Sequence, residues 1–183
     1  MPKVSDEYLE ARRSEILEGA RRAFAKHGYE GATVPRLEQE IGLSRGAIFH
    51  YFDSKLDLFV AIAIADNLRY QEVLTEQGVE AVVRAIAAAD RNWLSVLVET
   101  EVRLWHDPEF ERRMDMGPPD DAVVADLAQA QAEGKLRTDV ELSALLEFIM
   151  IVINGMAVRI VSGGEVDVES LVSLVNAALR PGH

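Results

Sequence analysis

Residues 33–55 read TVPRLEQEIGLSRGAIFHYFDSK, which is the pattern of two short helices joined by a glycine turn. In the first helix Val34, Leu37 and Ile41 fall on one face at helical spacing. Gly42 is expected to end this helix, because glycine adopts the left-handed conformation that closes a helix at little cost. The segment therefore begins with a short amphipathic helix.

A second helix is expected directly after this turn, over residues 45–50. Ser44 precedes it and can cap its first amides. Ile48 and Phe52, four residues apart, should face the core, whereas Arg45 lies on a different face. A helix of this kind fits the major groove of DNA, where its N-terminal residues meet base edges first. The pattern predicts a helix-turn-helix that reads DNA.

The first sixty residues resemble the DNA-binding domain of the TetR family of bacterial regulators. The resemblance rests on AFAKHGYEGATV (23–34), IGLSRGAIF (41–49) and HYFDSKLDLF (50–59), which agree with the family in order and spacing. It implies an all-α fold with a three-helix helix-turn-helix DNA-binding domain over residues 1–53. Residues 54–183 would then form a helical domain for effector binding and dimerisation.

The resemblance also implies which residues meet DNA. Arg45, Gly46 and His50 would approach bases, and the residues expected to hold phosphates are Thr33, Arg36, Tyr51 and Lys55. The cap Ser44 and Phe49 complete the predicted DNA-binding set. At Phe49 the family commonly has a tyrosine whose hydroxyl reaches the DNA backbone, and phenylalanine keeps the packing but lacks that donor. For His50 a base contact, a phosphate contact and a surface position without a role all remain open.

Within the family, the chain is similar to the actinobacterial aconitase repressors. This similarity rests on RRSEILEGARRAFAKHGYEGATV (12–34) and SRGAIFHYF (44–52), and more loosely on HDPEF, GKLRTDV and INGMAVRIVSGG. That subgroup is associated with a citrate-type effector, which would need a cationic or metal-assisted pocket. Because residues 114–134 contain neither Lys nor Arg, the composition favours an apolar or cationic effector instead.

The family's mechanism is a repressor whose effector changes the separation of two recognition helices. Candidate residues for an effector pocket are the large or polar side chains of the central helices: Trp93, Arg103, Trp105, His106, Phe110, Met114, Met150 and Asn154. Aromatic and Met side chains at helical spacing also serve as plain core, so only some of these are expected to touch a ligand.

Helical patterns continue to the C-terminus. Helices are expected over about 6–27, from a capping box at Ser54 to Asp57 onward to about residue 74, over 92–105, and over about 120–133. A short helix should follow Gly78. Asp107, Asp139 and Asp167 are expected to cap further helices.

The last two predicted helices indicate a homodimer. Residues 142–161 are apolar on almost every side, so the helix that they form must be covered all round. We expect a four-helix bundle between two copies, built from this helix and the final one. Its predicted interface residues are Phe148, Ile149, Val152, Met156, Leu171, Val172, Val175 and Leu179. A monomer with a deeply buried central helix is the alternative.

Charge is distributed unevenly along the chain. The formal net charge is -12, but residues 1–60 carry nine Lys or Arg against ten Asp or Glu, so nearly all the excess acid lies beyond residue 60. A local basic face can therefore bind phosphates while the acidic body faces away from the duplex. We expect modest DNA affinity with a strong dependence on salt.

Composition also limits the possible function classes. The chain has no cysteine, which excludes disulfides and thiolate chemistry and fits a cytoplasmic location. Its N-terminus has no signal-peptide pattern, and the apolar stretch 148–161 is too short to cross a bilayer. The sequence contains no recognisable catalytic, cofactor or metal-binding motif, so neither an enzyme nor a cofactor is expected. The remaining alternative is an acidic helical adaptor that binds proteins rather than DNA.

Overall fold

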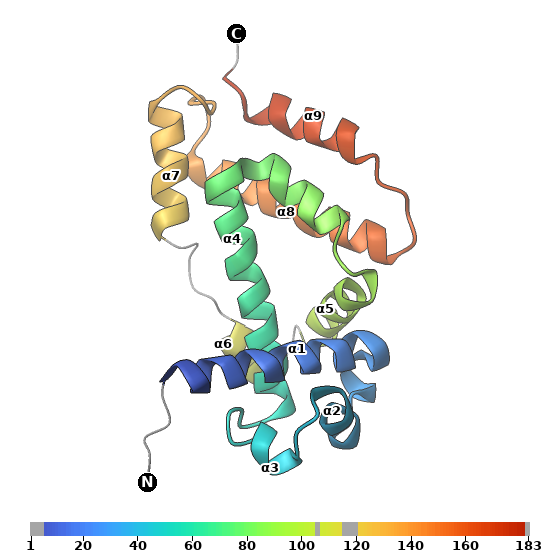
Figure 1. The fold of residues 1–183 in the computed structure, drawn as a ribbon. Helices are drawn as coiled ribbons and strands as arrows, with labels where there is room; N and C mark the ends of the chain where they lie inside the picture. The colour runs from blue at the N-terminus through green and yellow to red at the C-terminus, as the bar shows by residue number, and fades with distance from the viewer. Residues whose placement is uncertain (1–5, 105–106, 115–120, 182–183) are drawn as a thin grey trace. The chain divides into compact units, whose positions relative to one another are not determined.

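The chain is all-α, as its sequence predicts. The computed structural model describes residues 6–104, 107–114 and 121–181, and these ranges contain no β-strand. Figure 1 shows the helices, which are α1 (Asp6–Gly31), α2 (Val34–Ile41), α3 (Arg45–Ile48), α4 (Lys55–Ala87), α5 (Arg91–Leu104), α6 (Pro108–Met114), α7 (Asp121–Ala132), α8 (Leu142–Val161) and α9 (Val168–Leu179).

These helices belong to two compact units. Unit 1 consists of Met1–Asp66 and Ser95–Asp115, and unit 2 consists of Asn67–Leu94 and Met116–His183. Helices α4 and α5 each contribute residues to both units. The predicted division between residues 53 and 54 does not coincide with this boundary, because the first part of α4 packs within unit 1. As a division of function, it remains a prediction.

Unit 1 is held together by a small aromatic and aliphatic core. Phe24 of α1 and Phe59 of α4 are fully buried, with ring centroids 5.6 Å apart in an edge-to-face arrangement. Helices α1 and α2 approach closely at Gly19, where a Cβ atom would lie only 2.7 Å from the Cα of Ile41. A side chain at Gly19 would therefore push α2 away from α1.

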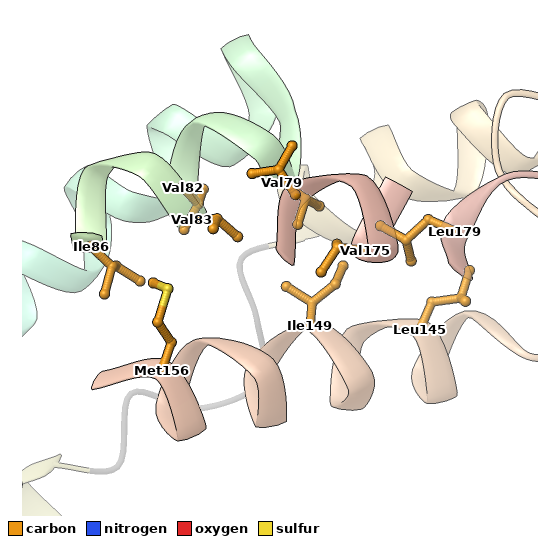
Figure 2. Close-up of a cluster of buried hydrophobic side chains, with 10 residues drawn as sticks. Val79, Val82, Val83, Ile86, Leu145, Ile149, Met156, Val175 and Leu179 are labelled. Carbon is orange, nitrogen blue, oxygen red and sulfur yellow. The ribbon is translucent and has the colours of Figure 1, made fainter. Parts of the chain in front are cut away.

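Unit 2 has its own core, formed by α8, α9 and the second part of α4. Figure 2 shows Ile149 and Met156 of α8 on the side of the helix that faces α4 and α9. They pack in one cluster with Val83 and Ile86 of α4 and with Val175 of α9. Burial of this cluster removes apolar surface from water, which is the main stabilising contribution to such a bundle.

Two long helices break at glycines. Gly28 in α1 has φ 71° and ψ 168°, and Gly78 in α4 has φ 82° and ψ 176°. Only glycine populates this backbone region readily. The expected end of the first helix at Gly28 is therefore a break with a further turn beyond it, and the expected short helix after Gly78 is the second segment of α4.

Most of the predicted helix caps form, but not all of them. Asp107 accepts a hydrogen bond from the Glu109 amide at 2.9 Å, and Asp167 accepts one from the Ser170 amide at 3.1 Å. The prediction for Asp139 is wrong, because α8 begins after Glu141 and the Asp139 carboxylate instead binds the Arg137 guanidinium. The neighbouring cation competes successfully for a carboxylate that is not directly at the helix start.

Candidate nucleic-acid interface

Helices α2 and α3 form the predicted helix-turn-helix. Gly42 follows α2 in the left-handed conformation, with φ 80° and ψ 17°, and its amide donates to the Glu38 carbonyl at 2.8 Å. Ser44 then caps α3, because its hydroxyl accepts a hydrogen bond from the Ala47 amide at 3.4 Å. Leu37 and Ile48 are buried beneath the two helices. The turn and the apolar contacts together fix the direction of α3.

The short recognition helix receives a second cap from α2. The Arg45 amide donates to the Glu38 Oε1 atom at 2.6 Å. Helix α3 is only four residues long, so its first amides cannot be satisfied within the helix. Glu38 therefore orients the start of α3 from the preceding helix. Sequence reasoning missed this residue, because a contact seven positions away across a turn has no local signature.

The residues predicted to approach bases share the exposed surface of this segment. Arg45, Gly46 and His50 are all exposed, and α3 ends at Ile48 rather than continuing through His50 as expected. Within the described ranges the Arg45 guanidinium has no hydrogen bond or ion pair. The His50 ring lies edge-to-face against Tyr51, with centroids 5.4 Å apart. The Arg45 guanidinium is therefore available for contacts at the N-terminus of α3.

Two of the cations expected to hold phosphates are bound to the end of α1. The Arg36 Nη1 atom donates to the Gly31 carbonyl at 2.8 Å. The Lys55 Nζ atom donates to the Tyr29 carbonyl at 2.9 Å and lies 4.4 Å from the centroid of the Tyr29 ring. Lys55 is half-buried, so it ties α4 to α1. A phosphate contact for either residue stays a prediction.

The remaining residues of the predicted DNA-binding set differ in their exposure to solvent. Thr33 and Ser44 are exposed, and Phe49 and Tyr51 are half-buried. Thr33 occupies the N-cap position of α2, but its side chain makes no capping hydrogen bond there. Its hydroxyl is thus not committed to the helix.

The start of α4 is anchored by a group of polar contacts. The Asp57 amide donates to the Ser54 hydroxyl at 3.1 Å, which is one half of the predicted capping box. The Asp57 carboxylate accepts from the Ser54 hydroxyl at 2.6 Å, whereas a capping box would have it accept from the Ser54 backbone amide. Asp57 also forms an ion pair with Arg113 of α6. Further along α4, the buried Asp66 carboxylate pairs with Arg21 of α1. These contacts hold α1, α4 and α6 together within unit 1.

A cluster of three aromatic side chains packs next to Lys55. The Tyr29 ring stacks on Phe24 at 5.8 Å and meets Phe59 edge-to-face at 5.2 Å. Burial, followed by the nearby acids Glu30 and Asp107, raises the pKa of the Tyr29 hydroxyl. Tyr29 therefore stays neutral at physiological pH and presents its ring face to Lys55.

The predicted effector residues with described side chains belong to both units, and an effector site formed by them stays a prediction. Trp93 is buried in unit 2 and Phe110 is buried in unit 1, whereas Met150 and Asn154 are exposed on α8. Trp105 and His106 of the predicted set lie outside the described residues. Arg103 and Met114 are described by their backbone alone. A cavity of about 320 Å³ lies elsewhere in unit 2, between α4, α7 and the end of α9.

Most of the predicted dimer residues belong to the core of unit 2. Ile149, Met156, Val172, Val175 and Leu179 are buried there, and the three that are only partly buried against the same core are Phe148, Val152 and Leu171. The second part of α4 covers this face, which the sequence pattern left without a partner. The large apolar side chains that remain exposed on these two helices are Met150, Ile151 and Val158 of α8 and Leu174 of α9.

The exposed apolar face makes α8 unusual among the described helices. Its 20 residues reach a mean hydropathy of 2.0, with 17% of the window buried. By length and composition alone this helix could cross a membrane, whereas the sequence predicts that the apolar stretch 148–161 is too short to do so. Core helices of soluble proteins pass the same test.

Known proteins resemble this chain over nearly its whole length. Residues 16–62 match the family described as bacterial regulatory proteins, tetR family. The chain is 43% identical to the HTH-type transcriptional repressor AcnR of Corynebacterium diphtheriae, over 98% of this chain and 97% of the relative. It is 41% identical to the HTH-type transcriptional repressor Rv1474c of Mycobacterium tuberculosis, over 89% of each chain.

Solved structures agree on the fold. The GusR protein of Salmonella enterica superposes with a TM-score of 0.71, covering 97% of this chain and 98% of that one at 21% identity. A TetR transcription regulator from Haloarcula marismortui gives a TM-score of 0.72 over 93% of this chain and 97% of that one, at 19% identity. The relatives that are named transcriptional repressors do not favour a protein adaptor or an enzyme. The chain therefore belongs to the TetR family of bacterial regulators, in its AcnR-like subgroup, and is a helix-turn-helix transcriptional repressor that binds DNA.

Proposed function

We propose that the protein is a ligand-responsive homodimer that represses transcription from a palindromic operator. The observation that carries this proposal is the exposed Arg45 guanidinium, which has no partner among the residues that the structure describes and lies at the start of a helix that is capped from two sides. A helix fixed in this way can present its first side chains to base edges in a reproducible position. Arg45, Gly46 and His50 would then read bases.

The dimer is proposed on the exposed face of α8 and α9. Met150, Ile151 and Val158 recur at helical spacing on α8, and Leu174 is 68% exposed on α9. Side chains of this size and apolarity favour burial against a second copy of the same face. This face differs from the interface predicted from the sequence, most of which the monomer buries itself.

The proposed dimer accounts for an operator with two-fold symmetry. Two recognition helices related by a two-fold axis require two half-sites, spaced by about one helical turn of DNA or a multiple of it. A soluble dimer that acts on the chromosome would reside in the cytoplasm. Its apolar α8 face would be covered by the partner, which gives this face a role that needs no membrane.

The DNA contacts are tested by substitution at two positions. Arg45→Ala should cost about 1–3 kcal/mol on the specific operator and relax the preference at one base pair. Arg36→Ala should weaken binding to all sequences uniformly and flatten the salt dependence if Arg36 reaches a phosphate. Fragments selected from genomic DNA supply the operator, and fluorescence anisotropy against random competitor supplies both affinities. An Arg45→Ala variant with unchanged operator preference would refute the proposed reading mode.

The dimer is tested by sedimentation at micromolar concentration. A double change, Ile151→Glu and Leu174→Glu, should convert the dimer to a monomer, because two charges would be buried without partners on each side of the interface. Val102→Glu is the matched control, since Val102 is 67% exposed but lies on α5 in unit 1. A wild-type protein that sediments as a monomer would remove the proposed dimer.

The effector class is tested by thermal-shift screening with carboxylates, lipophilic molecules and cationic compounds. The composition of residues 114–134 favours an apolar or cationic effector over citrate. A ligand that raises the unfolding temperature and also releases operator DNA would qualify as the effector. A coupling of about 1–3 kcal/mol would change operator occupancy by about 5- to 150-fold. Stabilisation by citrate would overturn the preference stated here.

A further inference from the structure

The cavity in unit 2 exists because small residues face one another across it. It lies between the second part of α4, α7 and the C-terminal end of α9, and measures about 320 Å³. Gly78 and Thr75 of α4 and Ala130 of α7 line it with little or no side chain. At Gly78 a Cβ atom would meet nothing within 4 Å. The helices therefore pack around a space that none of these side chains fills.

The wall of this cavity is mainly apolar. Its aliphatic lining comes from both helices, from the turn after α7 and from α9, and includes Leu74, Val79, Leu127, Leu136 and Leu179. The volume is at the small end of the range of about 300–1,000 Å³ that is typical of small-molecule sites. The cavity thus suits the apolar body of a small ligand.

Three charged residues also line the cavity, and cations prevail among them. Asp126, Lys135 and Arg180 all contribute to its surface. The Lys135 ammonium is paired with Glu133 at 2.6 Å. The exposed Arg180 guanidinium, by contrast, has no hydrogen bond or ion pair within the described part of the chain. A guanidinium in this state matches a carboxylate, which it can bind through two parallel hydrogen bonds.

The neutral polar groups at the cavity already make hydrogen bonds within the chain. The Thr75 hydroxyl hydrogen-bonds to the Gln71 and Glu72 carbonyls at 3.2 and 3.0 Å. The Asn176 amide donates to Glu80 at 3.3 Å. Among the described polar side chains that donate at the cavity, Arg180 is the one for which no hydrogen bond or ion pair forms. An alcohol would gain less from this site than an acid of the same shape, because it carries no charge to pair with the guanidinium. An amine would be attracted by Asp126 but repelled by both Lys135 and Arg180.

From these contacts we infer that the cavity binds a small amphipathic monocarboxylate, with its apolar body among the leucines and its carboxylate on Arg180. This inference rests on the proposed function, because it takes the bound acid to be the effector. Its apolar body agrees with the apolar class that residues 114–134 favour, and its single carboxylate departs from that preference because Lys135 and Arg180 supply cations from outside that segment. The cavity abuts the break in α4 at Gly78, and α4 contributes residues to both units. A ligand seated there acts on the helix that begins at Lys55. None of the described residues predicted from the sequence as effector contacts lines this cavity.

The experiment measures binding of octanoate to the full-length protein by calorimetry, without DNA. Octanoate should bind, and octan-1-ol and octylamine, which have the same chain, should bind at least about tenfold more weakly. Arg180→Gln should weaken octanoate binding by about tenfold or more. Arg91→Gln is the matched control, because Arg91 is an exposed arginine of unit 2 that lies outside the cavity. Its octanoate affinity should equal that of the wild type.

A second variant tests the location independently of charge. Ala130→Phe should fill the cavity and abolish octanoate binding, and its unfolding curve shows whether unit 2 still folds. Octanoate should also lower operator affinity in the wild type and not in Arg180→Gln. Failure of octanoate to bind, equal binding of octan-1-ol, or undiminished binding by Arg180→Gln would overturn the inference. So would octanoate binding that leaves operator affinity unchanged. Operator binding without octanoate is measured separately, so a failed cavity leaves the proposed DNA function standing.

Discussion

Glu38 offers a sharp test of how the recognition helix is held. Its Oε1 atom accepts the Arg45 amide at 2.6 Å, and Arg45 is the first residue of a four-residue helix. Replacing Glu38 with alanine removes this acceptor and leaves the start of α3 capped by the longer Ser44 contact, at 3.4 Å. The start of α3 should then fray in the free protein and must be ordered again when DNA binds.

The size of the effect follows from the geometry of this cap. Loss of a helix N-cap costs about 0.5–2 kcal/mol, and the half-buried position of Glu38 places it near the middle of that range. With about 1 kcal/mol lost in each protomer of the proposed dimer, specific binding should fall by about 2 kcal/mol, or about 30-fold. Removing two acids near the DNA opposes this loss for every sequence alike.

The ratio of operator affinity to random-DNA affinity separates these two effects. Glu38→Ala should lower the ratio by about 30-fold. Glu38→Gln keeps an oxygen acceptor and loses the charge, so it should preserve the ratio while both affinities rise. Glu18→Ala is the control for charge alone, because Glu18 is an exposed acid on α1 away from α3. Fluorescence anisotropy at several salt concentrations measures each value.

Two results would refute this reasoning. If Glu38→Ala keeps the wild-type ratio within about threefold, the cap does not order α3 for reading. If Glu38→Gln loses as much as Glu38→Ala, the carboxylate charge rather than the hydrogen bond orients the helix. A thermal-unfolding curve for each variant separates a local change at α3 from loss of the whole fold.

Three further predictions concern stability. Gly42→Ala should destabilise the protein by about 1–2 kcal/mol in urea unfolding, because an L-residue would be strained at φ 80°; an unchanged midpoint would contradict that assignment. Phe59→Ala should cost about 3–5 kcal/mol by the same measurement, since its ring is fully buried among aromatic neighbours, and a loss below about 1 kcal/mol would show a poorly packed core. The Arg84 guanidinium lowers the pKa of Glu169 and of Glu80 below their ordinary value of 4.5. The two carboxylates therefore add to the free energy of unfolding above pH 4.5, and this stabilisation is lost as the pH falls below that value. Thermal unfolding across this range should therefore show a smaller loss in Arg84→Gln than in the wild type, and parallel curves would argue against the network.

The sequence predicts the helix-turn-helix well because the signals that specify it are local. Gly42, Ser44 and the apolar spacing of α2 specify a turn between two helices without help from distant residues, and all of them behave as expected. The exposure of Arg45 follows from the same pattern, since buried and exposed positions alternate with the helical period. Here the sequence predicts the turn and the start of α3, although α3 ends two residues earlier than expected.

The predicted pocket and interface stay predictions, because both depend on which helix faces meet. An apolar residue on α8 can contact its own chain or a partner, and hydrophobicity alone does not distinguish the two. The second part of α4 covers Ile149 and Met156, so Ile151 and Leu174 are left exposed instead. Likewise, no pattern in the sequence brings Arg180 to α7, which ends 48 positions earlier in the chain.

The amino-acid sequence by itself determined the all-α class, the family and the turn that presents Arg45, because capping, glycine geometry and helical periodicity act within a few residues. Tertiary structure alone decided that Glu38 caps α3, that Lys55 is held by Tyr29 and that small residues leave a cavity beside Gly78. These features arise from contacts between helices. Side-chain spacing along one helix does not determine which other helix packs against it.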